Sequence, residues 1–278
     1  WRGRFDVLFD LEPFRRTSSI VAWMSGAPVR VGFDTNSRRH LYTNLVSYSG
    51  DNRFESDNML WQLRAIGITS PAVDAQDLRL ALPDRARTSA RELLEAAGVD
   101  PQRHLAIAVA VGALKPHHRW VRSEFAALIR LIKADDGNVR VLLVGSDRDL
   151  ADSHEVLREL GDDAGVTSFV GKLDLAGTLG VLSHCRILIA CDGGVLYMAA
   201  AMGCSTVSLW GPGVMERFKP PGEDHVGVRK GYACIPCVTW DRLGEFPPCP
   251  YGRRCYNDLR APEVLDAYLR VKARRAAG

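Results

Sequence analysis

The sequence has no long run of apolar residues and no strong excess of charge. A membrane-spanning helix needs about 20 consecutive, mostly apolar residues, and no stretch of this 278-residue chain comes near that length. The start of the chain also lacks the basic and then apolar pattern of a secretory signal. These two absences argue against a spanning segment and lead us to expect a cytoplasmic protein.

The charges nearly balance, because 36 Lys and Arg residues are matched by 33 Asp and Glu residues. The net charge of +3 is mild, and we find no basic stripe with interleaved aromatic residues of the kind that binds nucleic acid. We therefore expect no nucleic-acid partner, although a weakly basic surface suits anionic substrates. With 46% hydrophobic residues, the chain can bury the core of one large or two modest domains.

Apolar runs alternate with helical stretches along the chain, which predicts α/β domains. In the first part we expect strands at 5–11 and 29–33 and helices at 17–25, 56–66 and 85–97. Pro83 and a Gly-Val-Asp-Pro break bracket the last of these helices. We therefore place the domain boundary after it, so that residues 1–97 form an acceptor-side domain.

The second part contains a clearer doubly wound series. Its strands are continuous apolar runs, which is typical of a parallel sheet buried on both faces. We expect strands at 105–111, 139–144, 168–170, 187–190 and 205–210, and helices at 123–134, 151–160 and 175–183. Residues 98–261 form the second predicted domain, and 262–278 form a terminal helix. The expected fold class is α/β, with two Rossmann-like domains facing a cleft.

Asp192, Gly193 and Gly194 lie between the strand at 187–190 and an Ala-rich helix. In open α/β sheets ligands bind beyond the carboxyl ends of the strands, where N–H groups at a helix start can hold phosphate. Glycine lets a backbone approach a ligand closely. An ordinary tight turn is the alternative. However, the strand at 205–210 also ends in a Gly-Pro-Gly loop, so we expect two glycine-rich loops beside one cleft.

The order of these features resembles the ADP-heptose heptosyltransferase family of bacterial glycosyltransferases. The matching positions are 5–11, 26–27, 30–33, 111–113, 119–120, 145, 171–172, 192–194, 203–204, 211–212 and the clustered cysteines described below. The resemblance implies a two-domain GT-B enzyme that uses ADP-activated heptose to build the inner core of lipopolysaccharide. It also implies inverting transfer that needs no cofactor for catalysis.

The resemblance further implies that the second domain holds the nucleotide-sugar donor. The diphosphate is expected near Asp192–Gly194 and near the loop from Gly112 to Arg119, which includes Lys115 and His118. The adenine is expected by Gly145 and Leu173, although Leu173 fits plain core packing equally well, and Lys172 is a further residue expected to contact the donor. The implied acceptor is lipopolysaccharide or a related glycan, and this adds the expectation of peripheral contact with the inner membrane.

The sequence departs from the family at two donor-site positions. Where the family usually has a lysine, this chain has His118, and an imidazole is charged only in part at neutral pH. Lys115 and Arg119 are candidates to supply the remaining charge, unless all three are merely solvated loop residues. Where the family has a histidine, this chain has Tyr197, which can form a hydrogen bond but cannot act as a base near pH 7. Tyr197 also fits a packed helix position.

A third departure concerns the general base. In the family a strand and a Gly-Asp loop precede the segment that resembles residues 5–11, and that loop carries the base. Because the sequence opens at Trp1, we expect a truncated N-terminal domain with the base outside it. Asp10 and Glu12 are candidates for acceptor contacts, or else ordinary surface carboxylates. A catalytically silent GT-B protein that binds nucleotide or carbohydrate is the alternative function.

Four of the seven cysteines form the pattern Cys-x2-Cys-x11-Cys-x5-Cys. This spacing falls within the range of tetrahedral thiolate sites, so we expect structural zinc or iron at Cys234, Cys237, Cys249 and Cys255. Four protein ligands leave no open coordination position, which argues against metal catalysis. Unligated thiols and a disulfide are the alternatives. The other three cysteines lie in apolar contexts and are expected in the core.

Overall fold

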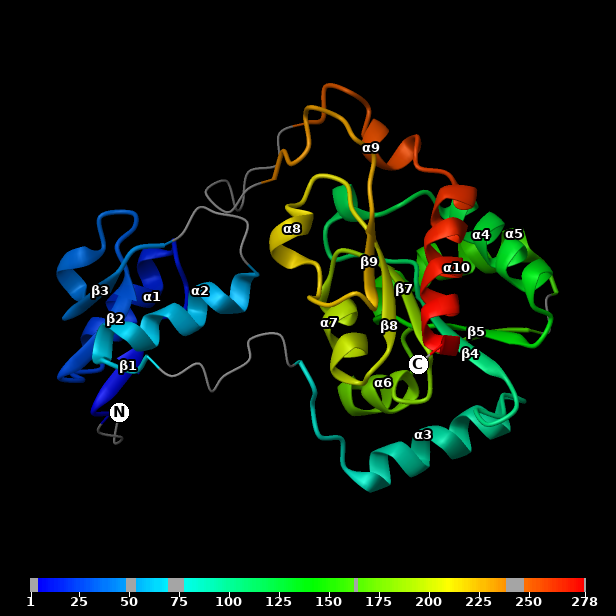
Figure 1. Ribbon diagram of the computed structural model, residues 1–278, viewed down its shortest axis with the longest axis horizontal. Coiled ribbons are helices and arrows are strands. Elements are labelled where there is room, and N and C mark those ends of the chain that lie inside the picture. The colour runs from blue at the N-terminus through cyan, green and yellow to red at the C-terminus, as the bar shows by residue number, and fades with distance from the viewer. Residues whose placement is uncertain (1–4, 49–53, 70–77, 163–164, 239–247, 278) are drawn as a thin grey trace. The chain divides into compact units, whose positions relative to one another are not determined.

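The computed structural model describes residues 5–48, 54–69, 78–162, 165–238 and 248–277. The chain divides into two compact units (Figure 1). The first contains residues 1–77 with the short segment Glu216–Phe218, and the second contains most of the chain from residue 78 on. The division therefore falls before the helix that the sequence predicted at 85–97, whereas we had placed the boundary after that helix.

The first unit is built on a three-stranded parallel sheet in the order β1-β2-β3. Its main elements are β1 (Val7–Phe9), α1 (Arg16–Met24), β2 (Val29–Phe33), β3 (Asn44–Val46) and α2 (Glu55–Trp61), with 3-10 turns at Arg39–Leu41 and Gln62–Ile66. Val31, Phe33 and Val46 form its buried core. The unit is an α/β structure, as predicted, but the short strand β3 was not foreseen.

Helix α1 turns its small residues inward and its large apolar residues outward. Ser19 and Ala22 are buried, whereas Ile20, Trp23 and Met24 are 48%, 57% and 66% exposed. A surface helix normally buries its apolar face. The first unit therefore presents an apolar stripe along α1.

The second unit is built on a six-stranded parallel sheet in the order β6-β5-β4-β7-β8-β9. From residue 78 on, the chain runs through α3 (Asp84–Ala96), β4 (Leu105–Ala110), α4 (Arg122–Asp135), β5 (Val139–Leu143), α5 (Leu150–Leu160), β6 (Val166–Ser168), α6 (Leu175–Leu182), β7 (Ile187–Cys191), α7 (Gly194–Ala201), β8 (Ser205–Leu209), α8 (Met215–Phe218), β9 (His225–Val228), α9 (Arg254–Asn257) and α10 (Ala261–Ala277). In the unit's own numbering this is the doubly wound order 3-2-1-4-5-6. The predicted parallel, two-faced sheet is confirmed.

Helices cover both faces of this sheet (Figure 1). Helix α4 contacts both α5 and α10, while α6 contacts α3 and α7. The four central strands β5, β4, β7 and β8 are almost wholly buried, whereas the outer strands β6 and β9 are half-buried. Apolar residues of α4 such as Phe125, Leu128 and Ile129 join the core with strand residues. Among the described helices, none combines the length and the apolar character that crossing a bilayer requires.

Helix α3 belongs to the second unit because it packs on α6. The contact is made through small residues, and a Cβ on Gly180 would stand 2.8 Å from both the Ala86 carbonyl oxygen and Cβ of Ala90. Leu94 of α3 is fully buried. The Gly98 break, where the sequence placed the domain boundary, therefore marks the end of a helix inside the second unit.

Candidate functional site

The strand order creates a switch point between β4 and β7. Strand β4 lies between β5 and β7, and the helices that follow β4 and β7 lie on opposite faces of the sheet (Figure 1). In sheets of this order the ligand crevice opens beyond the carboxyl ends of the strands at such a point. The loops that begin at Val111 and at Asp192 follow these two strands.

Asp192 is the residue on which these loops converge. Its Oδ2 lies 3.2 Å from Nδ1 of His118, in the loop after β4. A Cβ on Gly213, in the loop after β8, would stand 3.0 Å from the same oxygen. His118 is only 8% exposed and the Asp192 side chain is 20% exposed, so the contact lies just below the protein surface. The sequence predicted that glycine-rich loops lie together here, and the structure brings three loops to one carboxylate.

The two glycines after Asp192 have no structural reason to be glycine among the described residues. Gly193 is extended, with φ 172°, a conformation open to any residue. A Cβ there would meet only the Cys191 carbonyl oxygen, at 3.9 Å, and a Cβ on Gly194 would meet no atom within 4 Å. The start of α7 is thus open to close approach by a ligand, which its backbone N–H groups can bind.

The imidazoles of His117 and His118 are neighbours in the loop after β4. The rings of His117 and His118 lie 4.8 Å apart, edge to face. Burial lowers the pKa of His117 to about 4, and the charges of His118, Lys115 and Arg253 act in the same direction. His117 is therefore neutral near pH 7. The Lys115 carbonyl accepts the His118 N–H at 2.9 Å, which fixes the turn that aims His118 at Asp192.

Arg119, a predicted donor contact, is anchored within the protein. Its Nη1 lies 2.9 Å from Oδ2 of Asp152, and its Nε donates to the Ala113 carbonyl at 2.9 Å. Arg122 Nε contacts the other oxygen of Asp152 at 2.5 Å. Asp152 is 2% exposed and was missed in the sequence because it lies far along the chain in α5. Arg119 therefore shapes the loop that carries His118.

A crevice of about 330 Å³ opens beside this loop on the α4–α5 side. It is lined by Pro116, Arg119, Trp120, Val121, Arg122, Ser123, Glu155, Glu159, Arg253 and Asn257. Asp152 compensates two of its three arginines, and two glutamates line the same walls. The crevice is therefore not a site that attracts anions.

A second group of predicted residues gathers beyond β5 and β6. The Gly145 carbonyl accepts the Gly171 N–H at 3.0 Å, and Gly171 has φ +69°, a left-handed conformation that favours glycine. Lys172 is exposed and its Nζ donates to the Ser168 carbonyl at 2.8 Å. Leu173 is half-buried. The residues expected near the adenine thus lie together beyond the carboxyl ends of β5 and β6.

Asp149 links this second group to the loop after β4. Its carboxylate accepts the N–H and the hydroxyl of Ser146, both at 2.9 Å, and caps the turn before α5. The same carboxylate fills the space in front of Gly112, where a Cβ would overlap it. Gly112 is therefore required by packing as well as by its place in the loop. The Ser-x-x-Asp spacing is a capping-box signal that the sequence analysis missed.

Tyr197 lies in the first turn of α7 and is half-buried. It is neither a core residue nor a fully exposed one. Its contact with a donor stays a prediction.

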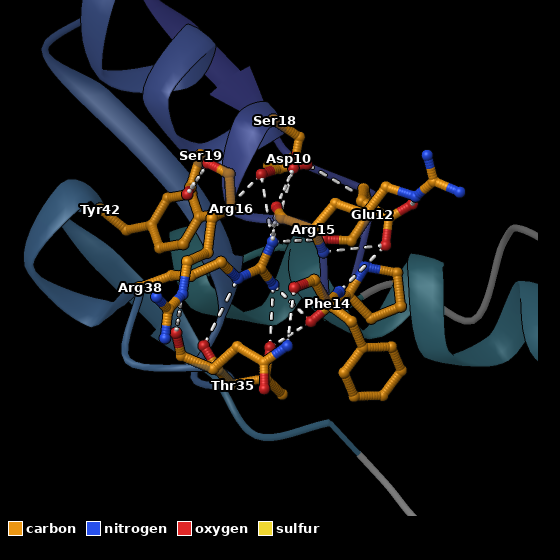
Figure 2. A network of polar contacts seen from close by, with 12 residues as sticks. Asp10, Glu12, Phe14, Arg15, Arg16, Ser18, Ser19, Thr35, Arg38 and Tyr42 are labelled. Carbon is orange, nitrogen blue, oxygen red and sulfur yellow. Dashed lines mark hydrogen bonds and ion pairs between the residues drawn. The ribbon is translucent and has the colours of Figure 1, made fainter. Parts of the chain in front are cut away.

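Asp10, a candidate for acceptor contact, is a buried structural carboxylate (Figure 2). It is 5% exposed and accepts the Tyr42 hydroxyl at 2.5 Å and the Glu12 N–H at 3.1 Å. Arg38, which is 1% exposed, approaches it to 3.7 Å. The Asp10 N–H donates to the Val31 carbonyl, so the residue continues the sheet and turns its side chain inward. In this geometry Asp10 is not available to an acceptor.

The segment that holds Cys234, Cys237, Cys249 and Cys255 is described except for residues 239–247, and its described parts contact the site at two points. Cys237 N–H donates to the Pro212 carbonyl at 3.1 Å, in the loop that also holds Gly213. At the other end, Arg253 donates to the Arg119 carbonyl. These two hydrogen bonds therefore help to hold the loop of Gly213 and the loop of His118, which both reach Asp192.

Two thiols of this segment have a raised pKa. Burial raises the pKa of Cys237, and Cys249 and Cys234 raise it further. Burial also raises the pKa of Cys255, with added effects of Cys237 and Cys249. All four are free thiols, as are the three cysteines expected in the core, which are buried. No group of three or more ligand side chains among the described residues has the geometry to hold a metal ion, so the zinc or iron site stays a prediction.

The doubly wound sheet and its converging loops define the second unit as a Rossmann-like α/β domain, and the fold of the chain is that of GT-B proteins. Solved structures support this assignment. The chain superimposes on Escherichia coli ADP-heptose lipopolysaccharide heptosyltransferase II with a TM-score of 0.72 and 17% identity, over 98% of this chain and 78% of that one. For E. coli heptosyltransferase WaaC with ADP-2-deoxy-2-fluoro heptose the TM-score is 0.66 at 15% identity, over 96% and 73%.

The family follows from the sequence comparison. The model of glycosyltransferase family 9 (heptosyltransferase) matches residues 2–244, and the chain belongs to this family. Lipopolysaccharide heptosyltransferase 2 of E. coli K12 is 29% identical over 108 residues, which are 38% of this chain and 30% of that protein. The aligned part thus covers less than a third of this relative.

Proposed function

We propose that this protein transfers a heptose-like sugar from a nucleotide-sugar donor, ADP-heptose or a close analogue, to lipopolysaccharide or a related glycan with inversion. The observation that carries the proposal is the convergence of His118, Asp192 and Gly213 at the switch point, beside the open start of α7. A structural relative, WaaC, was solved with an ADP-heptose analogue, which supports an ADP-linked donor.

In the proposed mechanism the second unit binds the donor and stabilises the leaving diphosphate. The N–H groups at the start of α7 bind a phosphate, and the helix dipole adds favourable charge there. Lys115 and His118 supply cationic character from the loop after β4. Asp192 accepts hydrogen bonds from the donor sugar. The adenine contacts the edge formed by Gly145, Lys172 and Leu173.

The first unit does not supply the base through Asp10, because this carboxylate is buried beside Arg38 and Tyr42. The base that deprotonates the acceptor hydroxyl is not assigned to any residue of this chain. A silent nucleotide-binding protein is therefore the second candidate function. This second candidate is favoured because no residue of this chain is assigned as the base. It is also favoured because His118 and Tyr197 replace the family's lysine and histidine.

Calorimetric titration with ADP tests the donor site. Gly193→Val should abolish binding without unfolding the protein, because the extended backbone accepts valine and the side chain would occupy the ligand's space. Gly137→Val is the matched control, since a Cβ there also meets no atom within 4 Å. Gly137 precedes β5 and so lies at the amino ends of the strands, away from the proposed site. Equal ADP affinity in wild type and Gly193→Val would rule out this site.

Turnover separates the two candidate functions. A protein that binds ADP-heptose and releases ADP when a lipopolysaccharide acceptor is added is an enzyme. One that binds the donor with the same affinity and releases no ADP is the silent protein.

We also propose that the apolar stripe of α1 makes the expected peripheral contact with the membrane that carries the acceptor. Trp23 and Met24 are the most exposed apolar residues of this stripe, and Arg15 and Arg16 at the start of the helix suit anionic headgroups. Trp23→Ser with Met24→Ser should reduce co-sedimentation with anionic phospholipid vesicles. Unchanged sedimentation of the double variant would refute the contact.

We further propose that Cys234, Cys237, Cys249 and Cys255 hold structural zinc or iron. The support is the spacing of the four thiols in the sequence and the raised pKa of Cys237 and of Cys255, to which neighbouring thiols contribute. Such a site would fasten the two ends of the loop to the donor site and take no part in the reaction. Elemental analysis of the purified protein should find about one metal per chain, and the metal should be lost in Cys237→Ser with Cys249→Ser.

A further inference from the structure

We propose that Arg253 is a positioning residue of the donor site, which holds the main chain beside His118 in the conformation that binds the donor. The inference rests on the proposed donor site and goes beyond it, because it assigns donor affinity to a residue 134 positions further along the chain than the one it holds. It starts from one hydrogen bond, in which Nη2 of Arg253 donates to the carbonyl oxygen of Arg119.

Arginine is an unfavourable residue at position 253 by local criteria. The backbone there is left-handed, with φ 57°, a conformation that glycine and asparagine adopt far more readily than arginine. Position 253 is also the N-cap of α9, and its side chain makes no capping hydrogen bond within the described part of the chain. Helices are capped best by Ser, Thr, Asp and Asn. A residue that breaks both local rules points to a role for its side chain elsewhere.

The Arg253 side chain is close to both parts of the site. Besides its bond to Arg119 in the loop after β4, its charge contributes to the low pKa of His117, which burial lowers to about 4. At the end of β7, burial raises the pKa of the Cys191 thiol to about 12, and the Arg253 charge opposes this rise. Cys191 directly precedes Asp192. The guanidinium is therefore near the strand that leads to the carboxylate as well as near the loop.

The bond from Arg253 fixes the main chain of the loop, whereas two other contacts fix side chains. The Arg119 guanidinium is paired with Asp152 at 2.9 Å. The indole Nε1 of Trp120 donates to the Leu259 carbonyl at 3.0 Å. Between these two anchored side chains lies the peptide group whose oxygen accepts from Arg253. The bond therefore restrains the one peptide group that joins both anchors.

This peptide group follows the turn that carries His118. The Lys115 carbonyl accepts the His118 N–H at 2.9 Å. The Pro116 carbonyl accepts the Arg119 N–H at 3.2 Å. Because these bonds make the turn one unit, a shift of the Arg119 peptide moves His118 relative to Asp192, from which it lies 3.2 Å away. A loop that is held in place before the donor binds loses less conformational freedom on binding, so the affinity is higher.

The test is the affinity for ADP, measured by calorimetry on variants of position 253. Arg253→Gly removes the side chain and suits the left-handed backbone. We expect its Kd for ADP to rise about tenfold, as for the loss of one hydrogen bond from a charged donor. Arg253→Lys keeps a charged donor together with the unfavourable backbone, and it should bind ADP more tightly than Arg253→Gly.

Thermal melting separates this role from a merely structural one. Glycine relieves the left-handed backbone, so Arg253→Gly should melt no lower than Arg253→Lys although it binds ADP more weakly. Support of the fold alone would give both quantities the same order. Arg260→Ala is the matched control, because the Arg260 side chain is 61% exposed and pairs with Glu124 at 2.9 Å. It should bind ADP with the wild-type Kd.

The outcomes distinguish this inference from the proposed function. Wild-type affinity for ADP in folded Arg253→Gly overturns the role of Arg253 and leaves the donor site in place. Arg253→Lys that binds ADP no more tightly than Arg253→Gly also overturns it, since a charged donor at this position would then have no effect. Absence of ADP binding by the wild-type protein overturns the donor site and this inference together.

Discussion

Tyr256 fills the space in front of Gly211, at the end of β8, so completely that a Cβ on Gly211 would overlap three atoms of its ring. The Tyr256 hydroxyl donates to the Leu209 carbonyl at 3.1 Å, and the residue is fully buried. This pair fixes the segment after Cys255 to the loop that leads to Gly213.

Gly211→Ala should therefore destabilise the protein. The ring of Tyr256 is held by its hydrogen bond and by the core, so it cannot move away without loss, and overpacking of this kind costs about 1–3 kcal/mol. Urea unfolding measures the change in the free energy of unfolding. Gly137→Ala is the control, because its Cβ would meet no atom within 4 Å. Equal midpoints for the two variants would contradict the packing described here.

Asp152→Ala should destabilise the second unit by about 2–4 kcal/mol, because it leaves the guanidinium of Arg119 without the buried carboxylate that it pairs with. Arg122 is more exposed and can be solvated. Glu155→Ala is the matched control on the same helix. Glu155 contacts Arg122 at 3.2 Å with both side chains 39% exposed, and its loss should change stability by less than about 1 kcal/mol. A smaller loss for Asp152→Ala than for Glu155→Ala would be inconsistent with the anchoring of Arg119.

Asp10→Ala should unfold or loosen the first unit, since it removes the counter-charge of the buried Arg38 and the acceptor of the Tyr42 hydroxyl. Breaking a buried pair of this kind costs about 3–5 kcal/mol. Limited proteolysis of the first unit reports the effect. Asp34→Ala is the control, because its pair with Arg39 is largely exposed. If Asp10→Ala instead resisted protease like wild type, Asp10 would again be a candidate for acceptor contact.

The stability of the second unit should fall in acid through His225. Burial lowers the pKa of this residue to about 4, with a further effect of the Lys219 charge. In the unfolded chain the histidine binds its proton near pH 6.5, so the unfolded state takes up more protons between pH 6.5 and 4. The contribution of His225 is complete above pH 6.5 and is lost as the pH falls toward 4.

His225→Gln should reduce this acid loss by about 1 kcal/mol, a figure that allows for solvent screening of a half-buried side chain, provided that glutamine keeps the contact with Thr206, which lies 3.0 Å from His225 Nδ1. Urea unfolding at pH 7 and pH 4.5 gives the difference. His154→Gln serves as a control, because His154 is an exposed residue of α5. A wild-type acid loss that persists unchanged in His225→Gln would assign the loss to other groups.

The sheet of the second unit was predictable because its strands are short apolar runs separated by amphipathic helices. Strands β4 and β7 were expected within a residue or two of where they lie. Strand β9 was missed, since His225–Val228 is brief, contains glycine and lies in a Pro- and Gly-rich region. Its pairing with β8 depends on a neighbour in space that the local pattern does not reveal.

The candidate site was predictable in its loops and less so in its side chains. Asp192 and its glycines follow a buried strand, and that local signal was sufficient. The inward position of Asp10 was not predictable, because it depends on Arg38 and Tyr42, which are distant in sequence. Arg119 was expected to meet a phosphate, but whether an arginine binds a ligand or a buried carboxylate is decided by tertiary structure.

The backbone hydrogen bond between Gly171 and Gly145 has a consequence for protein engineering. It joins the loops after β5 and β6, whereas Asp192 and Gly213 belong to the loops after β7 and β8. The loops beyond the carboxyl ends of the strands therefore form two groups, one on each side of β4. If the base of the donor is bound as proposed above, a combinatorial library confined to residues 171–173 should change the preference for the base and leave the contact between His118 and Asp192 unchanged.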